Sequence, residues 1–504
     1  MLVINTDLSL SFEFTDMLKQ EKEYTYLMKW GKFMDIFESM IGHVNDFLWS
    51  YILIIVLLGL GLYFTIRTGF VQFRLLPEMF RAVADKQSYD ASGKKGTSSF
   101  QAFAISAASR VGTGNMAGVA SAVALGGPGA LFWMWLIALL GAASGFVEST
   151  LAQLYKEKDN NQYRGGPAYY IEKGMKKRWL GIVFAIMITF TYGLVFNSVQ
   201  SNTISIAFSS QFDIDPVWIA VILTIFVAIV IFGGLKSIAN VSQIIVPFMA
   251  IIYIGLALII LALNITVIPD MFVLIFENAF GIREVAGGGF GAAIMLGIKR
   301  GLFSNEAGMG AAPNAAATAE VSHPVKQGLV QALGVFFDTI LVCSATGLII
   351  LSAGGFAGSE EDGIALTQTA FTQMLGDWAG IFIAIAIFLF AFSSILGNYY
   401  YGENNLAYIK DSKTILFIYR IAALVMVVFG TLASFGLVWS LADVTMALLA
   451  LINLYAISIL FKKANILLKD YMRQRKEGKD PVFYKDTLDD QTGIECWERE
   501  TEKQ

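Results

Sequence analysis

The segment Arg110-Val-Gly-Thr-Gly-Asn-Met-Ala-Gly-Val119 lies within an apolar stretch, yet it contains three glycines and the polar side chains of Thr113 and Asn115. Glycine inside a helix costs roughly 0.5–1 kcal/mol relative to alanine, and clustered glycines let the backbone leave the α-helical region. A second segment of this kind, Phe303-Ser-Asn-Glu-Ala-Gly-Met-Gly-Ala-Ala-Pro313, follows later in the chain. The sequence therefore predicts two broken helices.

A broken helix has a particular meaning in a membrane. Unwound backbone is tolerated there only where it is buried in protein or lines a cavity, because each unsatisfied peptide group costs several kcal/mol. The break exposes N–H groups with a partial positive charge at one half-helix end and carbonyl groups at the other. The first end can hold an anion and the second a small cation. Two such breaks at matching positions are typical of the binding site of an inverted-repeat secondary transporter.

The composition places this chain in the membrane. Of its 504 residues, 56% are hydrophobic and 15% are charged, and the mean hydropathy is +0.61; soluble domains contain about 25% charged residues. The net charge of −4 suggests no nucleic-acid partner. Cys343 and Cys496 are too far apart in depth for a disulfide, and no metal-ligand spacing occurs. His43 and His323 fall at segment ends, so we expect no enzyme.

The apolar segments predict an all-α polytopic membrane protein with eleven transmembrane helices. One N-terminal helix, Tyr51 to Ile66, is slightly short for a span unless its flanks contribute. Two sets of five helices follow, each opening with its broken member, as expected of a 5+5 inverted repeat. The first set covers 98–124 (broken), 129–155, 180–208, 216–232 and 243–264, and the second covers 287–319 (broken), 328–353, 378–406, 414–433 and 436–461.

These segments divide the chain into five parts. The predicted parts are an N-terminal amphipathic segment with the extra helix (1–66), a basic cytoplasmic segment (67–97), the first repeat (98–264), the second repeat (265–461) and a charged cytoplasmic tail (462–504). The polar composition of the tail predicts partial disorder.

Charged loops alternate along the chain. Every second loop is basic, whereas the loops between them carry acids such as Asp213, Asp270 and Asp377. We expect the protein in the plasma membrane. Because cytoplasmic loops are enriched in Lys and Arg, and because the helix count is odd, the N-terminus is predicted to lie outside the cell and the C-terminus in the cytoplasm. The lipid bilayer is thus an expected partner, and the oligomeric state is left open.

The first break offers both kinds of exposed peptide end. Thr113, Gly114 and Asn115 would present N–H groups suited to a substrate carboxylate, and the carbonyls of Ala108 and Val111 would be free for a cation. The alternative is a glycine-lined helix crossing, because Gly114 and Gly118 have the small-xxx-small spacing.

Further polar residues occur at membrane depth in other helices. Phe390, Ser393, Ser394 and Asn398 share one face of the helix 378–406. Oxygen atoms on such a face suit a small hard cation, although serine hydroxyls also bond back to their own helix. Two further candidates for a substrate's polar groups are Gln200 and Ser304.

An acid in the second break is costly in a membrane. Glu306 is most simply paired with Arg300 or Arg110, and the sequence does not distinguish a structural ion pair from a gating or coupling role.

Several long motifs occur in an order that resembles the alanine or glycine:cation symporter family, over about residues 50–460. They are GTGNMAGVA (112–120), GGPGALFWMW (126–135), GGPAYYI (165–171), FGGLKSIANV (232–241), GLFSNEAGMGAAPNAAATA (301–319) and FSSILGNYYYGE (392–403). The resemblance implies the leucine-transporter fold and sodium-coupled uptake of small neutral amino acids, with sodium as the coupling ion and no other cofactor.

The resemblance also implies a set of site residues. The sodium site would use the carbonyls of Ala108, Val111 and Phe390 and the hydroxyls of Ser393 and Ser394. The substrate would bind at Thr113, Gly114, Asn115, Gln200, Ser304 and Asn398.

One position departs from the family pattern. Alanine-preferring members can carry a bulky Trp where this chain has Asn398. An amide there leaves room and adds a hydrogen-bond partner, which makes glutamine a further candidate beside alanine and glycine.

Proton coupling is the main alternative to sodium coupling. Five acids fall in or near apolar helices, namely Glu148, Glu306, Asp338, Glu403 and Asp443. Against protons, the helix 243–264 contains no Lys or Arg that could replace the cation with a fixed ammonium group. A channel would favour a pore motif or a ring of charges, and neither is evident.

Overall fold

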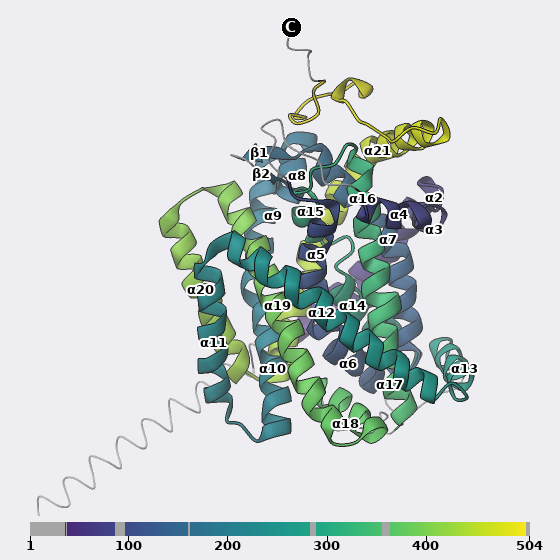
Figure 1. Ribbon diagram of the computed structural model, residues 1–504, viewed down its shortest axis with the longest axis vertical. Helices are drawn as coiled ribbons and strands as arrows, with labels where there is room; N and C mark the ends of the chain where they lie inside the picture. The colour runs from purple at the N-terminus through teal and green to yellow at the C-terminus, as the bar shows by residue number, and fades with distance from the viewer. Residues whose placement is uncertain are drawn as a thin grey trace, which may run out of the picture.

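The computed structural model describes residues 36, 38–85, 96–159, 162–282, 289–354 and 363–499. Within these residues the protein is almost wholly helical, and its two short strands, β1 (Glu157–Asp159) and β2 (Gln162–Arg164), pair antiparallel. The long helices run between two ends of the molecule (Figure 1).

The N-terminal helix is longer than the predicted segment 51–66. A continuous helical span covers Glu38–Arg67, because η1 (Leu48–Leu53) and the residues before it extend α2 (Ile54–Arg67). The flank therefore supplies the length that the apolar segment alone lacked. Two short helices follow, α3 (Val71–Arg74) and α4 (Leu76–Val83).

The first set of helices opens with a broken member, as predicted. Its elements are α5 (Ser99–Arg110), η2 (Gly114–Gly118), α6 (Val119–Gly126), α7 (Ala130–Leu154), α8 (Pro167–Met175), α9 (Arg178–Phe190), η3 (Thr191–Phe196), α10 (Asn197–Phe212), α11 (Pro216–Phe232) and α12 (Gly234–Leu263). A capping box of Ser98 and Gln101 begins α5, since each side chain bonds the backbone N–H of the other residue.

The second set repeats this order after α13 (Ile268–Ala279). Its elements are α14 (Phe290–Asn305), α15 (Ala312–Ala316), α16 (Pro324–Val335), η4 (Phe336–Cys343), α17 (Ser344–Ala353), α18 (Ile364–Leu375), α19 (Trp378–Ile409), α20 (Lys413–Leu432), α21 (Phe435–Lys476) and η5 (Lys485–Thr487). The second break again lies in the first member, between α14 and α15.

Burial separates helices of the interior from helices of the periphery. Most residues of α7 and the middle of α19 are buried, whereas α11 exposes large apolar side chains such as Trp218, Ile222 and Ile229. Exposed apolar faces of this kind suit a lipid environment. The broken helices α5 and α14 lie among the interior elements, which places both breaks inside the protein.

Length and composition alone identify fewer spans than the prediction. Seven helices of the described chain are long and apolar enough to cross a membrane, or eight if the pair Pro247–Leu263 and Ile268–Ala279, bent by 101°, forms one span. Gly114–Gly126 and Pro216–Phe232 are apolar but shorter. The chain is thus a multi-pass membrane protein, and the count of eleven stays a prediction.

One end of the molecule carries the basic loops that the structure describes, and we call it the basic face. It comprises the C-terminal ends of α2, α7, α19 and α21 and the N-terminal ends of α5, α9, α16 and α20 (Figure 1). The turn between α10 and α11, with Asp213 and Asp215, lies at the other end. The alternation of basic and acidic loops therefore corresponds to two opposite ends.

The C-terminal region differs from its prediction in two ways. Helix α21 continues to Lys476 instead of ending near 461, and the segment after it packs on the basic face. Phe483 and Trp497 are buried there; the Phe483 N–H donates to the Ser322 carbonyl at 2.9 Å and the Trp497 indole N–H donates to the Gln153 carbonyl at 3.1 Å. Apolar side chains scattered among the charges anchor this segment, so composition alone suggested too little order.

Candidate functional site

The first break separates α5 from η2. Val111 has an extended backbone with ψ of 92°, so the chain leaves the helix after Arg110 and re-enters it near Gly114. Asn115 bridges the gap, because its Oδ1 accepts a hydrogen bond from the Gly112 N–H at 2.8 Å. A Cβ on Gly112 would lie 2.2 Å from Ser394 Oγ, so the close approach of α19 requires glycine. The predicted break is present, but it is shorter than 110–116: Val111 and Gly112 leave the helix, and Gly114–Gly118 is helical again as η2.

Four oxygen atoms gather beside this break. Ser394 Oγ lies 3.1 Å from the Ala108 carbonyl, 3.5 Å from the Val111 carbonyl and 3.0 Å from the Phe390 carbonyl. Ser393 Oγ lies 2.9 Å from the same Phe390 oxygen, which adds a fifth oxygen at the edge of the group. We call these five atoms the oxygen cluster.

The oxygen cluster contains no formal charge, and all five of its residues are buried. Buried oxygens that face one another favour a small cation, because the two hydroxyl hydrogens of the cluster cannot satisfy all of its acceptor lone pairs. The serine back-bonding that the sequence left open is also present, since both hydroxyls contact the Phe390 carbonyl. Back-bonding alone does not account for the contacts of Ser394 with α5.

Gln200 of α10 contacts the start of the second half of the broken helix. Its Oε1 accepts hydrogen bonds from the Thr113 N–H at 3.1 Å and the Thr113 hydroxyl at 2.6 Å. An acceptor therefore already lies at the N–H end that was predicted to receive a carboxylate. The structure brings Gln200 and Thr113 together, as a shared site requires.

The two breaks contact each other directly. A Cβ on Gly114 would lie 3.1 Å from Ser304 Cα, and the Asn115 Nδ2 atom donates to Ser304 Oγ at 3.1 Å. Asp338 of η4 joins them, because its Oδ1 accepts from Asn115 at 2.6 Å and its Oδ2 accepts from Ser304 at 2.8 Å. Cys343 Sγ lies 3.3 Å from Asn115 Nδ2 and 3.1 Å from Ser304 Oγ.

Asn398 lies on the other side of the first break. Its Oδ1 accepts a hydrogen bond from Ser109 Oγ at 2.8 Å, and the same hydroxyl lies 2.7 Å from Glu306 Oε1. Asn398 is 1% exposed, and its Nδ2 atom has no hydrogen-bond partner in the described part of the chain. A buried amide donor of this kind is costly unless a ligand or water satisfies it.

The second break is stabilised by an acid from another helix. Glu306, Gly308 and Gly310 have φ of 58°, 86° and 81°, so the backbone between α14 and α15 is left-handed at three positions. Glu148 of α7 accepts hydrogen bonds from the Gly308 and Gly310 N–H groups, each at 3.1 Å, and from Asn453 Nδ2 at 2.6 Å. Glu148 therefore satisfies backbone donors that the unwinding leaves free. The predicted break at 303–313 is confirmed.

Arg300 does not pair with Glu306. Its guanidinium bonds both carboxylate oxygens of Asp443, at 2.9 and 3.3 Å, and lies 4.1 Å from the centre of the Trp439 ring. Arg110, the other predicted partner, donates to the Gln331 carbonyl at 3.2 Å. Arg300 was a candidate because it is near in sequence, but a helix residue six positions upstream points to a different side of α14.

The predicted site residues therefore fall into connected groups around the first break. Thr113 joins Gln200, Asn115 joins Ser304, and Asn398 reaches the break through Ser109. Asp338 and Cys343 were not among the predicted site residues. The acid was conspicuous in an apolar helix, but a single buried cysteine carries no signal of its own.

Comparison with known proteins agrees with this architecture. The family model described as the sodium:alanine symporter family matches residues 34–485. The amino-acid carrier protein AlsT of Bacillus subtilis (strain 168) is 55% identical over 93% of this chain and 99% of its own. The probable sodium/glutamine symporter GlnT of the same organism is 53% identical, over 92% and 96% of the two chains.

A further relative is archaeal. The sodium/alanine symporter AgcS of Methanococcus maripaludis is 42% identical, over 84% of this chain and 95% of its own. The family match covers most of the chain, including both breaks, and the relatives are matched over nearly their whole length. The chain therefore belongs to the sodium:alanine symporter family, and it is an amino-acid symporter rather than an enzyme.

Proposed function

We propose that this protein couples the entry of sodium to the uptake of a small neutral amino acid, alanine or glycine, with glutamine as a further substrate. The observation that carries the proposal is the oxygen cluster beside the start of the second half-helix, where the Thr113 N–H donates to Gln200 Oε1. A cation at Ala108, Val111, Phe390, Ser393 and Ser394 would lie next to a carboxylate at Thr113, Gly114 and Asn115. Each charge would then lower the cost of burying the other.

The contacts of Gln200 suggest how the substrate carboxylate would bind. Its Oε1 accepts from both donors of Thr113, at 3.1 and 2.6 Å, where the substrate carboxylate would bind. A carboxylate is the stronger acceptor, so it would displace this amide oxygen and leave Gln200 free to contact the substrate. Ser304 and Asn398 would line the rest of the pocket, with the unpartnered Asn398 amide as a donor.

Transport would proceed by alternating access. The substrate and the cation would bind where the two broken helices meet, and the elements that carry the breaks would move against the remaining helices. One positive charge moving down about 100 mV supplies ~2.3 kcal/mol, which corresponds to roughly 40-fold accumulation at about 1.4 kcal/mol per tenfold. A sodium concentration gradient would add to this.

We also propose that the basic face is cytoplasmic, with the N-terminus outside. The positive-inside rule supports this orientation, because Arg67, Arg74, Lys173, Lys410 and Lys413 belong to segments of that end. The C-terminal segment after α21 would then lie inside the cell.

Proton coupling is the alternative to sodium coupling, and the position of Asp338 favours it. Asp338 is buried and directly bonds Asn115 and Ser304, so a proton on this carboxyl would change the hydrogen bonds of two candidate substrate residues. The oxygen cluster argues for sodium, because none of its five atoms belongs to an ionisable side chain.

Proteoliposomes separate the two coupling ions. We expect labelled alanine, glycine or glutamine to accumulate when an inward sodium gradient is imposed without a pH difference. We expect only background uptake with an inward proton gradient in sodium-free buffer. Accumulation driven by protons alone would contradict sodium coupling and favour Asp338 as the coupling group.

Substrate size is the subject of a second test. In the Asn398→Trp variant, we expect roughly fivefold more glutamine to be needed to halve labelled alanine uptake, because one hydrogen bond of about 1 kcal/mol is lost and the indole fills the space. Competition by unlabelled glycine serves as the control and should change little. Equal sensitivity to glutamine in the parent and the variant would remove Asn398 from the specificity argument.

A further inference from the structure

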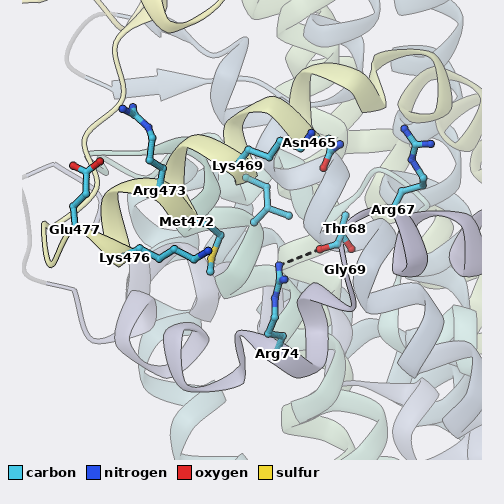
Figure 2. A pocket seen from close by; sticks show the side chains of 11 residues that line it. Arg67, Thr68, Gly69, Arg74, Asn465, Lys469, Met472, Arg473, Lys476 and Glu477 are labelled. Atoms are coloured by element: carbon cyan, nitrogen blue, oxygen red, sulfur yellow. Dashed lines mark hydrogen bonds between the residues drawn. The ribbon is translucent and has the colours of Figure 1, made fainter.

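A pocket lies on the basic face, away from the two breaks. It has a volume of about 620 Å³ and opens between the end of α2, the α2–α3 turn with the last residue of α3, and the last turns of α21 (Figure 2). Its lining consists of Arg67, Thr68, Gly69, Arg74, Asn465, Leu468, Lys469, Met472, Arg473, Lys476 and Glu477. We call this cavity the basic pocket.

The basic pocket has more basic side chains in its lining than nearby carboxylates pair with. Glu477, the acid of its lining, bonds Lys479 at 2.7 Å, and Arg473 bonds Asp470 at 2.5 Å. The other four basic residues have no carboxylate within 4.0 Å in the described part of the chain. They are Arg67, Arg74, Lys469 and Lys476. Like charges that share a cavity repel one another, so an anion bound there would be stabilising.

Two of these cations are well placed for an anion. Arg74 donates one Nη2 hydrogen bond to the Thr68 carbonyl at 3.3 Å, which orients its guanidinium at the mouth of the α2–α3 turn. In Figure 2, the side chains of Arg74 and Lys476 extend into the space between that turn and α21. A guanidinium with an ammonium beside it suits the oxygens of a phosphate group.

The depth of the pocket is that of a lipid headgroup. No charged residue occurs between Asp46 and Arg67, so Arg67 marks the point where the apolar span of α2 ends. The segment that follows exposes Phe70, Phe73 and Phe80 by 51%, 49% and 60%. Aromatic rings exposed beside cations at the end of a span are typical of the boundary between hydrocarbon and headgroups.

The pocket is also bounded by fixed elements. Glu78 of α4 bonds Arg475 at 2.8 Å and Tyr471 at 3.2 Å, and Phe64 of α2 packs on Phe461 of α21 with ring centres 5.2 Å apart. These contacts hold α4 and α2 against α21 on two sides of the cavity. The cations therefore face a preformed space rather than a gap between independent helices.

We propose that the basic pocket binds the phosphate headgroup of an anionic phospholipid. The phosphate would lie between Arg74 and Lys476, with Lys469 further along the lining beside Asn465. The acyl chains would run along the exposed side of α2, where Tyr63 and Ile66 are 42% and 56% exposed. A free phosphate ion offers the same headgroup chemistry, but it would gain nothing from the apolar surface beside the pocket. This binding site is separate from the transport site and does not depend on which ion drives transport.

Lipid retention by the full-length protein tests the proposal. The parent and the Arg74→Gln, Lys469→Gln, Lys476→Gln triple variant are purified in a nonionic detergent and incubated with phosphatidylglycerol or phosphatidylcholine of identical acyl chains. We expect native mass spectrometry to show at least fivefold more phosphatidylglycerol than phosphatidylcholine on the parent. The triple variant should lose at least fivefold of its bound phosphatidylglycerol.

A matched variant controls for the loss of charge. Lys410→Gln, Lys413→Gln and Lys462→Gln remove three exposed cations of the basic face that do not line the pocket, and this variant should retain lipid like the parent. If the pocket variant does not fold, the single changes Lys469→Gln and Lys476→Gln should each reduce bound phosphatidylglycerol about twofold. Equal retention in the pocket and control variants would overturn the proposal.

Thermal unfolding separates the lipid from a free anion. We expect phosphatidylglycerol to raise the unfolding temperature of the parent by several degrees, with little effect of sodium phosphate at the same headgroup concentration. An equal shift with phosphate alone would overturn the lipid assignment and identify a free-anion site.

Discussion

Replacing Ser393 and Ser394 by alanine together should raise the sodium concentration for half-maximal uptake at least tenfold. Ser394 Oγ lies within 3.5 Å of three carbonyl oxygens, and Ser393 Oγ is 2.9 Å from one of them. A hydrogen-bonding group next to a charge contributes roughly 1.5–3 kcal/mol, and about 1.4 kcal/mol corresponds to a tenfold change in affinity. The measurement is the initial rate of alanine uptake as a function of sodium concentration.

The control for this prediction comes from the same broken helix. Ser106 of α5 is buried, and its hydroxyl bonds the Phe103 carbonyl of its own turn at 2.9 Å. Ser106→Ala removes a comparable hydroxyl without touching the oxygen cluster, so its sodium dependence should match the parent. If the double variant also matched the parent while both proteins were expressed equally, the cation would have to bind elsewhere.

The two breaks could be predicted because their signal is local. Glycines with Thr and Asn stand out within an apolar segment, and one short stretch of sequence is enough to reveal the conflict with a continuous helix. The face of α19 could be predicted for a similar reason, since helical spacing alone places Ser394 and Asn398 together. Both residues do contact the end of α5, through Ala108 and Ser109.

The partners of the buried acids could not be predicted in this way. Glu148 bonds Gly308, and Asp338 bonds Asn115, and both contacts join helices that are far apart in the sequence. Sequence reasoning identifies each acid as costly, but its partner depends on how the helices pack. The pairing of Arg300 with Asp443 instead of Glu306 illustrates the same limit.

The order of the C-terminal segment could not be predicted from the sequence, for a different reason. Its composition is strongly charged, yet Phe483 and Trp497 bury their rings on the basic face, beside each other at 5.5 Å between ring centres. Widely spaced apolar residues give no helical or strand periodicity, so the pattern that usually predicts order is missing.

A large loss of transport is also expected of the variant Gly112→Ala. We expect it to reduce amino-acid uptake on the order of 50-fold, although it adds only one methyl group. The new Cβ would lie 2.2 Å from Ser394 Oγ and 3.1 Å from Gln200 Oε1. It would displace the hydroxyl from the oxygen cluster and push Gln200 away from Thr113. Overpacking costs roughly 1–3 kcal/mol, and about 2.4 kcal/mol corresponds to a 50-fold change. The measurement is labelled alanine uptake per amount of protein in the membrane.

Two companion variants show whether this loss comes from the site. Gly59→Ala in α2 is the matched control, because a Cβ there meets no atom within 4 Å, and its uptake should stay within about twofold of the parent.

Adding Ser394→Gly to Gly112→Ala removes the Oγ and Cβ atoms that the new methyl group would meet. At saturating sodium, we expect this double variant to recover part of the maximal rate while keeping a weak sodium affinity. Unimpaired uptake by Gly112→Ala alone would mean that the first break does not form the transport site. Loss of uptake without any recovery in the double variant would point to a general defect of the helix.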